Sequence, residues 1–449
     1  MVLIVVLVFA MLAGFLITST QNLERAMAPS PPLEETTQVP ATDTPPPPTS
    51  TAAPDEGFRA QVRAARLFDQ IAHQVELQRA LAPRAEVPLS FLDEGEMEAV
   101  LRERYGQEDR ETRLLPYQAL GLLPELPSDL QVEVPAGIYI PEHKQLYVKA
   151  GGPESDAETQ ALLAHGYVHA LQDQHFDLGG IASRAGTTDE RLALDALIEG
   201  DATLATALYS DADLSATDWD RWTDLIVASE QPDYGSPAVD DTPWTRLRRF
   251  ANQEGRQFAT ALFERGGWDA VNQAYTDPPR STELVLHPSR YLGGSSTRGT
   301  PEQPRSVVVP DLSPVLGEGW QMVVEDTLGE FVVGLYLNQA MTEEKACDAA
   351  DGWDGDTLLI WSREDGSRVQ VWRSLWSDTG EAREFEQALV TIVPQRHFPV
   401  RPIAPPRGGP GRWWQIRSGT VHLRREGRYV VMICAPDTNT LINLLEIVP

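Results

Sequence analysis

The segment from Ala161 to Leu178, which reads ALLAHGYVHALQDQHFDL, constrains the fold of this chain more than any other. Its two histidines, His165 and His169, are four residues apart. On an α-helix this spacing places both rings on one face, one turn apart. The opposite face is apolar and has to pack against other elements. The pattern predicts a buried helix, running to about Gln174, that turns a pair of imidazoles toward an interior site.

A second predicted helix, from Asp189 to Tyr209 with Thr187 and Glu190 as its capping pair, supplies a carboxylate for the same site. A histidine pair at this spacing is a clamp for Zn²⁺, and a catalytic zinc takes a third protein ligand and keeps a fourth position for water. Glu199 lies in the middle of this helix, within ALIEGDA. Asp195 lies one turn earlier on the same face, and we expect it to hydrogen-bond a ligating imidazole. The sequence thus predicts a zinc site of His165, His169 and Glu199.

These segments resemble the gluzincin class of zinc metallopeptidases, in which HExxH supplies two ligands and the base, and a later glutamate supplies the third ligand. More narrowly, the chain resembles an uncharacterised group of membrane-anchored or secreted prokaryotic proteins that carry HE-x-x-H-ALQDQ. The likeness covers most of residues 137–390 and rests on HGYVHALQDQHFDL, ALIEGDA, PPRSTELVLHPSRYL and DGWDGDTLLIW. It implies a metallopeptidase-like scaffold with His165, His169 and Glu199 at the ligand positions.

One position departs from the family pattern, because Gly166 stands where the family has the catalytic glutamate. That glutamate moves a proton from the zinc-bound water to the leaving amine, and general acid–base catalysis contributes roughly 10²- to 10⁴-fold. Glycine has no side chain for this step, but the missing glutamate is not a ligand, so zinc binding can survive. We therefore expect a zinc-binding homologue, inactive or impaired in proteolysis, that binds or regulates a peptide or protein.

Two other functions stay open. The first is an active zinc endopeptidase that uses a substitute base, for which Asp173 is one choice. The second is a metal-free structural protein of the cell envelope, in which hydrogen bonds hold a former metal site together. His287, in ELVLHPSRYL, is either a cleft residue that bonds a transition-state oxygen or a buried histidine before a proline turn.

The N-terminal residues predict an anchor followed by a stalk. Residues 1–20 contain the apolar run VLIVVLVFAMLAGFLIT, which is long enough for a short membrane span. No Lys or Arg precedes this run, so an uncleaved anchor is favoured over a cleaved signal peptide. Residues 21–56 are rich in Pro and Thr, a composition typical of an extended stalk. We expect a single-pass protein of the cell membrane with the bulk of the chain extracytoplasmic.

Charge and cysteine content narrow the partners and the compartment. The formal net charge is −29, and a surface of that sign repels DNA and RNA, so we expect no nucleic-acid partner. The two cysteines, Cys347 and Cys434, both lie in the last quarter of the chain. They are either a disulfide, which an oxidising compartment would permit, or two separate buried thiols.

Changes in composition divide the remaining chain into two folded domains of an α+β protein. Residues 57–305 predict a mostly helical metallopeptidase-like domain with a small β-edge, which we place at two short strands within residues 137–148. A segment rich in Pro, Gly and Ser closes this domain. Residues 306–449 predict a smaller α+β domain of alternating strands and helices, with a hairpin turn at Asp365–Gly366. Its many tryptophans are expected in the core and in cross-strand pairs.

Overall fold

The part of the chain that the structure describes begins at residue 56. The computed structural model describes residues 56–105, 109–123, 134–150, 157–210, 219–230, 242–293, 303–406 and 409–449. The predicted anchor, and all of the predicted stalk except residue 56, lie outside these ranges. Within these ranges, no helix has the length and apolar character that a membrane crossing needs.

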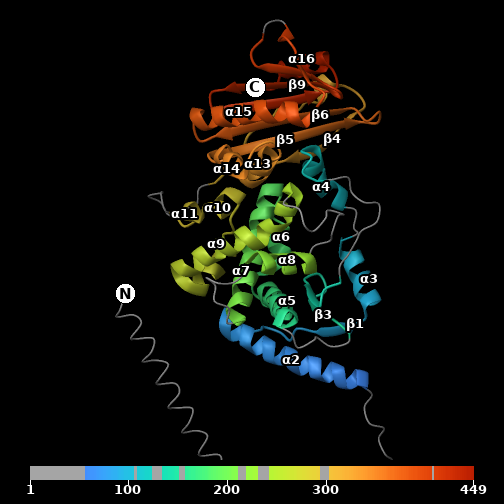
Figure 1. Cartoon of the computed structure of the whole chain (residues 1–449), viewed down its shortest axis with the longest axis vertical. Coiled ribbons are helices and arrows are strands. Elements are labelled where there is room, and N and C mark those ends of the chain that lie inside the picture. The colour runs from blue at the N-terminus through green and yellow to red at the C-terminus, as the bar shows by residue number, and fades with distance from the viewer. Residues whose placement is uncertain are drawn as a thin grey trace, which may run out of the picture. The chain divides into compact units, whose positions relative to one another are not determined.

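Helices dominate the first part of the fold, as predicted (Figure 1). In chain order they are α2 (Glu56–Arg79), α3 (Glu94–Tyr105), α4 (Asp109–Ala119), α5 (Ala157–Phe176), α6 (Leu178–Ala182), α7 (Thr188–Tyr209), α8 (Trp219–Glu230), α9 (Pro243–Ala274), α10 (Thr282–Leu286) and α11 (Pro288–Tyr291). The two helices predicted to carry the site are confirmed as α5 and α7. Helix α5 ends two residues after its predicted end, and α7 begins one residue before its predicted start. Helix α5 packs against both α2 and α7.

Helix α7 begins at a capping residue that the sequence identifies. Thr187 has an extended backbone, and its side chain accepts a hydrogen bond from the backbone N–H of Glu190. This satisfies one of the N–H groups that the first helical turn leaves without an intrahelical partner. The N-terminal end of α7 also contacts the later sheet, because the backbone N–H and hydroxyl of Thr188 both donate to the carboxylate of Asp326.

A three-stranded sheet lies beside α5. It consists of β1 (Leu89–Leu92), β2 (Gly137–Ile140) and β3 (Gln145–Lys149) in the order β1-β3-β2. The pair β2–β3 is the antiparallel hairpin predicted within residues 137–148, and β1 joins β3 in parallel. This sheet is the small β-edge of the helical region.

The second part of the fold is built on a seven-stranded antiparallel sheet. Its order is β4-β5-β6-β10-β9-β8-β7. The strands are β4 (Trp320–Asp326), β5 (Trp353–Arg363), β6 (Arg368–Trp376), β7 (Arg401–Pro402), β8 (Arg412–Ile416), β9 (Gly419–Glu426) and β10 (Tyr429–Ala435). The associated helices are α12 (Ser313–Leu316), α13 (Gly329–Asn338), α14 (Glu343–Asp348), α15 (Thr379–Arg396) and α16 (Thr438–Leu445). The chain is thus an α+β protein, as predicted.

Apolar side chains cover both faces of this sheet, because neighbouring strand residues point to opposite sides. Val430 belongs to the core beneath α13 and α15, whereas Val431 belongs to the core beneath α16. Figure 1 shows α15 lying along the sheet. The predicted packing role of the tryptophans is confirmed, since six of them are buried: Trp353, Trp361, Trp372, Trp376, Trp413 and Trp414. Cys347 and Cys434 are both free thiols, so they form no disulfide with each other.

Candidate metal centre

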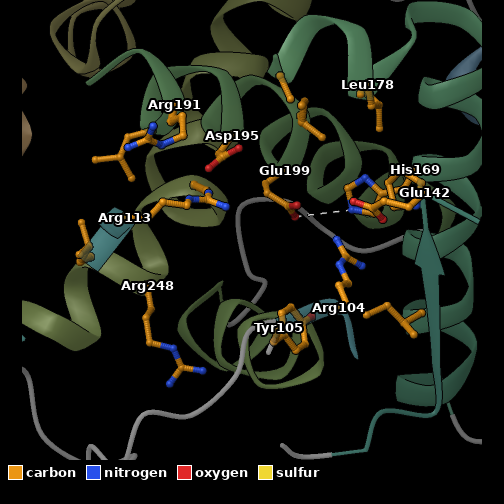
Figure 2. Close-up of a pocket in the computed structure, with 18 of the residues that line it drawn as sticks. Arg104, Tyr105, Arg113, Glu142, His169, Leu178, Arg191, Asp195, Glu199 and Arg248 are labelled. Carbon is orange, nitrogen blue, oxygen red and sulfur yellow. Dashed lines mark ion pairs between the residues drawn. The ribbon is translucent and has the colours of Figure 1, made fainter. Parts of the chain in front are cut away.

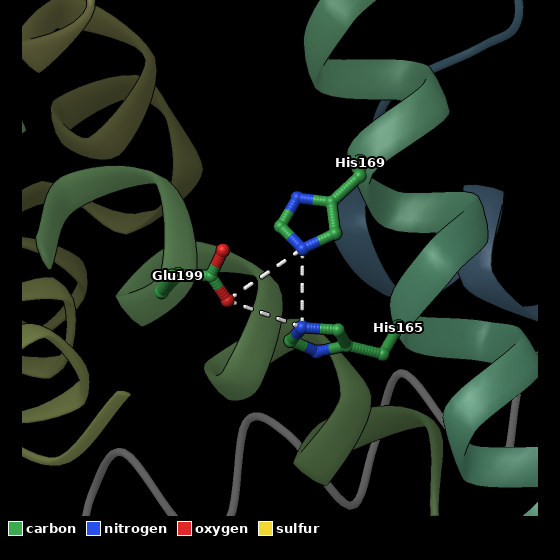
Figure 3. A group of neighbouring side chains, drawn as sticks. All are labelled: His165, His169 and Glu199. Atoms are coloured by element: carbon green, nitrogen blue, oxygen red, sulfur yellow. Dashed lines mark hydrogen bonds and ion pairs between the residues drawn. The ribbon is translucent and has the colours of Figure 1, made fainter. Parts of the chain in front are cut away.

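The three side chains predicted as metal ligands converge on one point (Figure 3). The Nε2 atoms of His165 and His169 lie 3.1 Å apart. Glu199 Oε2 lies 3.3 Å from the Nε2 atom of His165 and 3.6 Å from that of His169. Both histidines are buried, and Glu199 is partly buried. The structure therefore brings together all three predicted ligands, from α5 and α7.

These separations fit one zinc ion. Zinc lies about 2.0–2.1 Å from nitrogen and oxygen ligands, so tetrahedral geometry separates adjacent ligand atoms by roughly 3.3–3.4 Å. The three distances between the ligand atoms, 3.1, 3.3 and 3.6 Å, scatter around that value. One ion can contact all three atoms, with a fourth position left over.

The tautomer of His169 is fixed by Gln172, one turn further along α5. The Gln172 Nε2 amide donates to the carbonyl oxygen of Ile198 at 3.0 Å and to Asp201 Oδ2 at 2.9 Å. Its Oε1 atom therefore faces His169 Nδ1, at 2.8 Å, and Nδ1 must carry the proton that is donated. The lone pair of a neutral His169 ring then lies on Nε2, the atom that points at the other two ligands.

Thr206 has the same effect on His165. The Thr206 hydroxyl donates to the carbonyl oxygen of Ala202 at 2.7 Å, so its oxygen accepts in its 3.4 Å contact with His165 Nδ1. The proton of the neutral ring is on Nδ1 and the lone pair is on Nε2. Two nitrogen lone pairs and a carboxylate oxygen thus face one another. A proton could bridge only one pair of these atoms, whereas a metal cation satisfies all three.

Glu199 is oriented by a residue from a third helix. Asn252, a buried residue of α9, donates from Nδ2 to Glu199 Oε2 at 3.0 Å. Helices α7 and α9 approach closely enough for this contact because glycines meet at their crossing. A Cβ atom on Gly200 would lie 2.0 Å from the carbonyl oxygen of Gly255, and one on Gly255 would lie 2.1 Å from that of Ala196. Any larger residue at these positions would separate the helices.

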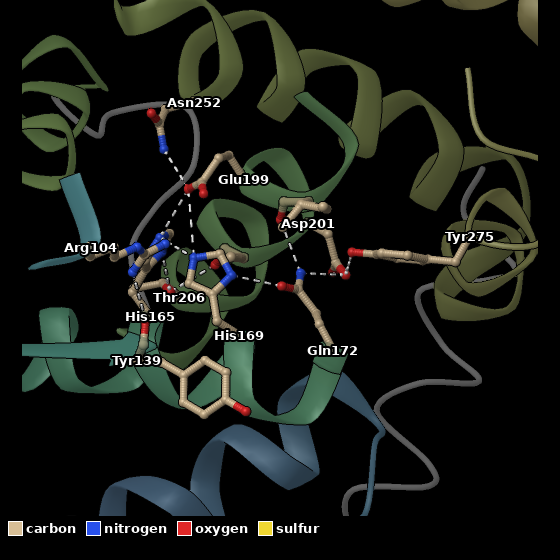
Figure 4. A network of polar contacts seen from close by, with 12 residues as sticks. Arg104, Tyr139, His165, His169, Gln172, Glu199, Asp201, Thr206, Asn252 and Tyr275 are labelled. Atoms are coloured by element: carbon tan, nitrogen blue, oxygen red, sulfur yellow. Dashed lines mark hydrogen bonds and ion pairs between the residues drawn. The ribbon is translucent and has the colours of Figure 1, made fainter. Parts of the chain in front are cut away.

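The hydrogen bonds continue from His169 through Gln172 to Asp201 (Figure 4), and Asp201 forms a buried ion pair with Arg79. Asp201 accepts from Gln172, from the Tyr275 hydroxyl at 2.8 Å, and from Arg79 Nε at 2.6 Å. The side chains of Arg79 and Asp201 are both fully buried. Arg79 also donates to Asn272 Oδ1 at 2.7 Å. The position of His169 is therefore tied, through Gln172, to contacts between α2, α7 and α9.

Gln172 gives a direct test of this support. Replacing Gln172 with alanine removes the acceptor on His169 Nδ1 but none of the three ligands. Loss of such a partner typically weakens metal binding about 10- to 100-fold. We expect that loss of zinc affinity in a competition titration against a chelator of known affinity. The matched control is Gln174→Ala, because Gln174 lies on the same helix and hydrogen-bonds the backbone at Arg84 and Ala85 instead. Equal zinc affinities for the two variants would contradict the assigned role.

Gly166 faces the small sheet. A Cβ atom at this position would lie 2.9 Å from Leu146 Cδ1 and 3.6 Å from the backbone nitrogen of Tyr139. Tyr139 and Leu146 are paired residues of β2 and β3. The buried Leu146 side chain thus crowds the place where a residue-166 side chain would begin, and a Cβ atom there requires the flexible end of Leu146 to move.

A cavity of about 670 Å³ opens beside the metal centre (Figure 2). His169 and Glu199 line it, together with two carboxylates that are not metal ligands, Glu142 and Asp195. Asp195 is exposed, but the cavity that it faces is walled by protein. The surrounding protein desolvates the Asp195 carboxylate. This desolvation, with the charge of Glu199, raises the pKa of Asp195 to about 6 against the opposing effect of Arg113 and Arg191.

Three further residues that the sequence offered for the site, Asp195, Asp173 and His287, do not hydrogen-bond the two imidazoles in the described part of the chain. Asp195 hydrogen-bonds neither imidazole within the described ranges; Gln172 and Thr206 contact the rings instead. Asp173, the proposed substitute base, already accepts from the Tyr139 hydroxyl and from Lys144, so it fastens the β2–β3 hairpin to α5. His287 lies away from the cavity lining and pairs with Glu330 of α13 at 2.9 Å. This hydrogen bond is the main reason that its pKa is raised.

Three supporting residues were not identified from the sequence. Two of them had a local signal, since Gln172 follows His169 by three residues and Thr206 follows Glu199 by seven, and both spacings stay on one helical face. Asn252 had none, because its contact depends on how α9 crosses α7.

Comparison with known proteins gives one match, and it lies outside the metal centre. Residues 318–445 match a family described as a domain of unknown function (DUF8575). This stretch is under a third of the chain. It covers the whole seven-stranded sheet, from β4 to β10. None of the three ligands lies in it. No curated protein matches the chain, and no solved structure does.

Proposed function

We propose that this chain is a zinc-binding relative of metallopeptidases that has lost or impaired hydrolysis and that uses its cavity to bind a peptide or protein. We further propose that residues 1–20 anchor it in the cell membrane with the folded part extracytoplasmic. The apolar run and the Pro/Thr-rich segment after it support that location.

One observation carries the proposal of zinc. Two imidazole Nε2 atoms and one carboxylate oxygen converge within 3.6 Å of one another, and their neighbours direct both nitrogen lone pairs to the same point. Two histidines with one glutamate are a common ligand set of catalytic zinc, whose remaining position holds water or a ligand. Two of the three ligand residues also line the cavity, which places a ligand of the metal within reach of anything bound there.

Gly166 supports the loss of hydrolysis. A zinc-bound water attacks a peptide bond efficiently when a neighbouring base takes its proton and returns it to the leaving amine. Position 166 cannot provide that base, and Asp173 is engaged by Tyr139 and Lys144. Zinc without a base can still hold a peptide carbonyl or carboxylate, which is what a binding protein needs.

The test uses the full-length chain purified in a mild detergent. We expect about one zinc per chain by elemental analysis and no release of peptides from casein above a metal-free control. Zinc with rapid cleavage would replace this proposal with an active peptidase. A chain that takes up no zinc would leave the metal-free structural protein.

Restoring the missing base tests how much of the catalytic apparatus remains. We expect Gly166→Glu to raise casein cleavage at least about 10²-fold over the natural chain, since general acid–base help is worth about that much. The end of the Leu146 side chain has to move to admit the new Cβ atom. Gly166→Gln is the matched control, because it adds similar bulk without a base. Equal activity of the two variants would show that more than the glutamate has been lost.

One observation favours the active peptidase as a second candidate. Asp195 lines the cavity one helical turn from Glu199, and its pKa of about 6 suits a group that exchanges protons near neutral pH. If the natural chain does cleave casein, Asp195→Asn should abolish the cleavage and keep the zinc.

A further inference from the structure

The cavity beside the metal centre is rich in arginine, although the chain is strongly acidic. Four arginines line it, namely Arg104, Arg113, Arg191 and Arg248. The whole chain has 66 acidic residues and 37 basic ones. Against that background the cavity has more guanidinium groups than carboxylates, since its acidic residues are Glu142, Asp195 and Glu199. A bound metal would add further positive charge.

Within the described ranges, three of these arginines make no hydrogen bond to a carboxylate, although the charges of Arg113 and Arg191 both act on Asp195. Within the described ranges Arg104 donates to the carbonyl oxygen of Tyr139, and Arg191 donates to the hydroxyl of Thr188. Arg113 makes no hydrogen bond there, and its charge acts on Asp195 from a distance. A guanidinium group has five N–H donors, so most of the donors of these three side chains stay available to a ligand.

Arg104 and Arg191 reach the cavity from different elements (Figure 2). Arg104 points toward Glu199 and His169. Arg191 precedes Glu199 by eight residues on α7, with Asp195 between them, so all three share one face of the helix. At 1.5 Å per residue, Arg191 begins about 12 Å along the axis from Glu199. An extended peptide advances about 3.3 Å per residue, and this separation therefore spans about three to four residues.

The shape and the remaining lining of the cavity suit a peptide. A volume of about 670 Å³ is within the usual range of ligand sites, roughly 300–1,000 Å³. Apolar side chains also line the wall, including Leu114, Tyr117, Leu178 and Trp244. A ligand that matches this lining has both apolar groups and fixed negative charge.

From this arrangement we infer that the cavity binds a peptide bearing acidic side chains, with a carboxylate held by Arg113 and Arg191 about three to four residues from the part that meets the metal. The inference rests on the proposed function and gives its ligand class. Arginine matches a carboxylate with two parallel N–H···O bonds, which makes the pairing selective as well as strong.

The net charge of the chain does not oppose this binding. Repulsion from exposed acidic groups is screened beyond about 8 Å at physiological salt, whereas contacts inside a cavity are screened much less. The local guanidinium groups therefore decide which ligand is held, and the overall charge affects only the approach.

The test is calorimetric titration of the full-length chain with two peptides, Ac-Ala-Glu-Glu-Glu-Ala-amide and its counterpart with three glutamines. We expect the glutamate peptide to bind at least about tenfold more tightly, because hydrogen bonds to charged groups are worth more than neutral ones. The double variant Arg113→Gln, Arg191→Gln should lose that preference and leave the glutamine peptide unchanged. Arg417→Gln is the matched control, since Arg417 is exposed in the turn between β8 and β9.

Zinc content and thermal unfolding, measured on the same samples, separate the possible failures. If the double variant unfolds, the single variant Arg113→Gln is used in its place. The Arg113 side chain is exposed, so we expect this variant to fold. Equal affinity for the two peptides, no binding of either, or a preference that survives the arginine variants would overturn the inference. A chain without zinc that still prefers the glutamate peptide would refute the proposed metal and keep the inferred ligand.

Discussion

His165→Ala is expected to lower the zinc content of the purified full-length chain from about one ion to near zero. The variant removes one of three ligands and opens a void around the other two, so the remaining side chains can no longer enclose an ion in tetrahedral geometry. Because metal that binds only the folded state stabilises it, we also expect a lower unfolding temperature. Elemental analysis after dialysis against a weak chelator makes the measurement.

His175→Ala is the matched control for this prediction. His175 lies on the same helix, but its ring hydrogen-bonds the carbonyl oxygen of Ala82 at 2.7 Å, on the side of α2 rather than at the metal centre. The His175→Ala variant should therefore keep its zinc. Retention of zinc by the His165 variant, or equal loss from both variants, would contradict the ligand assignment.

Arg79→Ala is expected to lower the free energy of unfolding by about 3–5 kcal/mol, the usual result of leaving one charge of a buried ion pair without its partner. Arg79 and Asp201 are fully buried and joined by hydrogen bonds of 2.6 and 3.0 Å. Urea denaturation, followed by circular dichroism, measures the change.

A second variant shows how much of the lost stability comes from the unpaired buried charge and how much from lost packing. Arg79→Met together with Asp201→Leu removes both charges, and replacing a buried pair by apolar residues is often close to neutral. We expect it to recover most of the stability lost in Arg79→Ala. Its zinc affinity should still fall, since Asp201 holds Gln172 in place behind His169. A destabilisation of under about 1 kcal/mol for Arg79→Ala would show that the pair contributes little.

The local features of the fold were readable from the sequence because they depend on neighbouring residues. The histidine spacing in α5, the Thr187 cap of α7 and the turn at Asp365–Gly366 all act within one or two turns of chain. Gly366 has a φ of +83°, a value that glycine adopts without strain. The grouping of His165 and His169 with Glu199 was expected from the histidine spacing together with the resemblance to gluzincins, and the structure places these three side chains together.

What the sequence did not reveal depends on contacts between distant segments. Asn252 reaches Glu199 only because Gly200 and Gly255 let two helices touch. The arginine-lined cavity draws on α3, α4, α7 and α9, and no local pattern joins these elements. Asp195 does not hydrogen-bond the imidazoles as expected, because helical spacing gives the face of a residue but not its partner.

Zinc K-edge X-ray absorption on the full-length chain tests the central claim most directly. We expect a first shell of light atoms at about 2.0–2.1 Å, with the outer-shell scattering of two imidazoles and no sulfur. The imidazole signal should disappear in His165→Ala. A zinc shell that contains sulfur, a zinc spectrum that the His165 variant leaves unchanged, or a chain that holds no zinc at all would contradict the account.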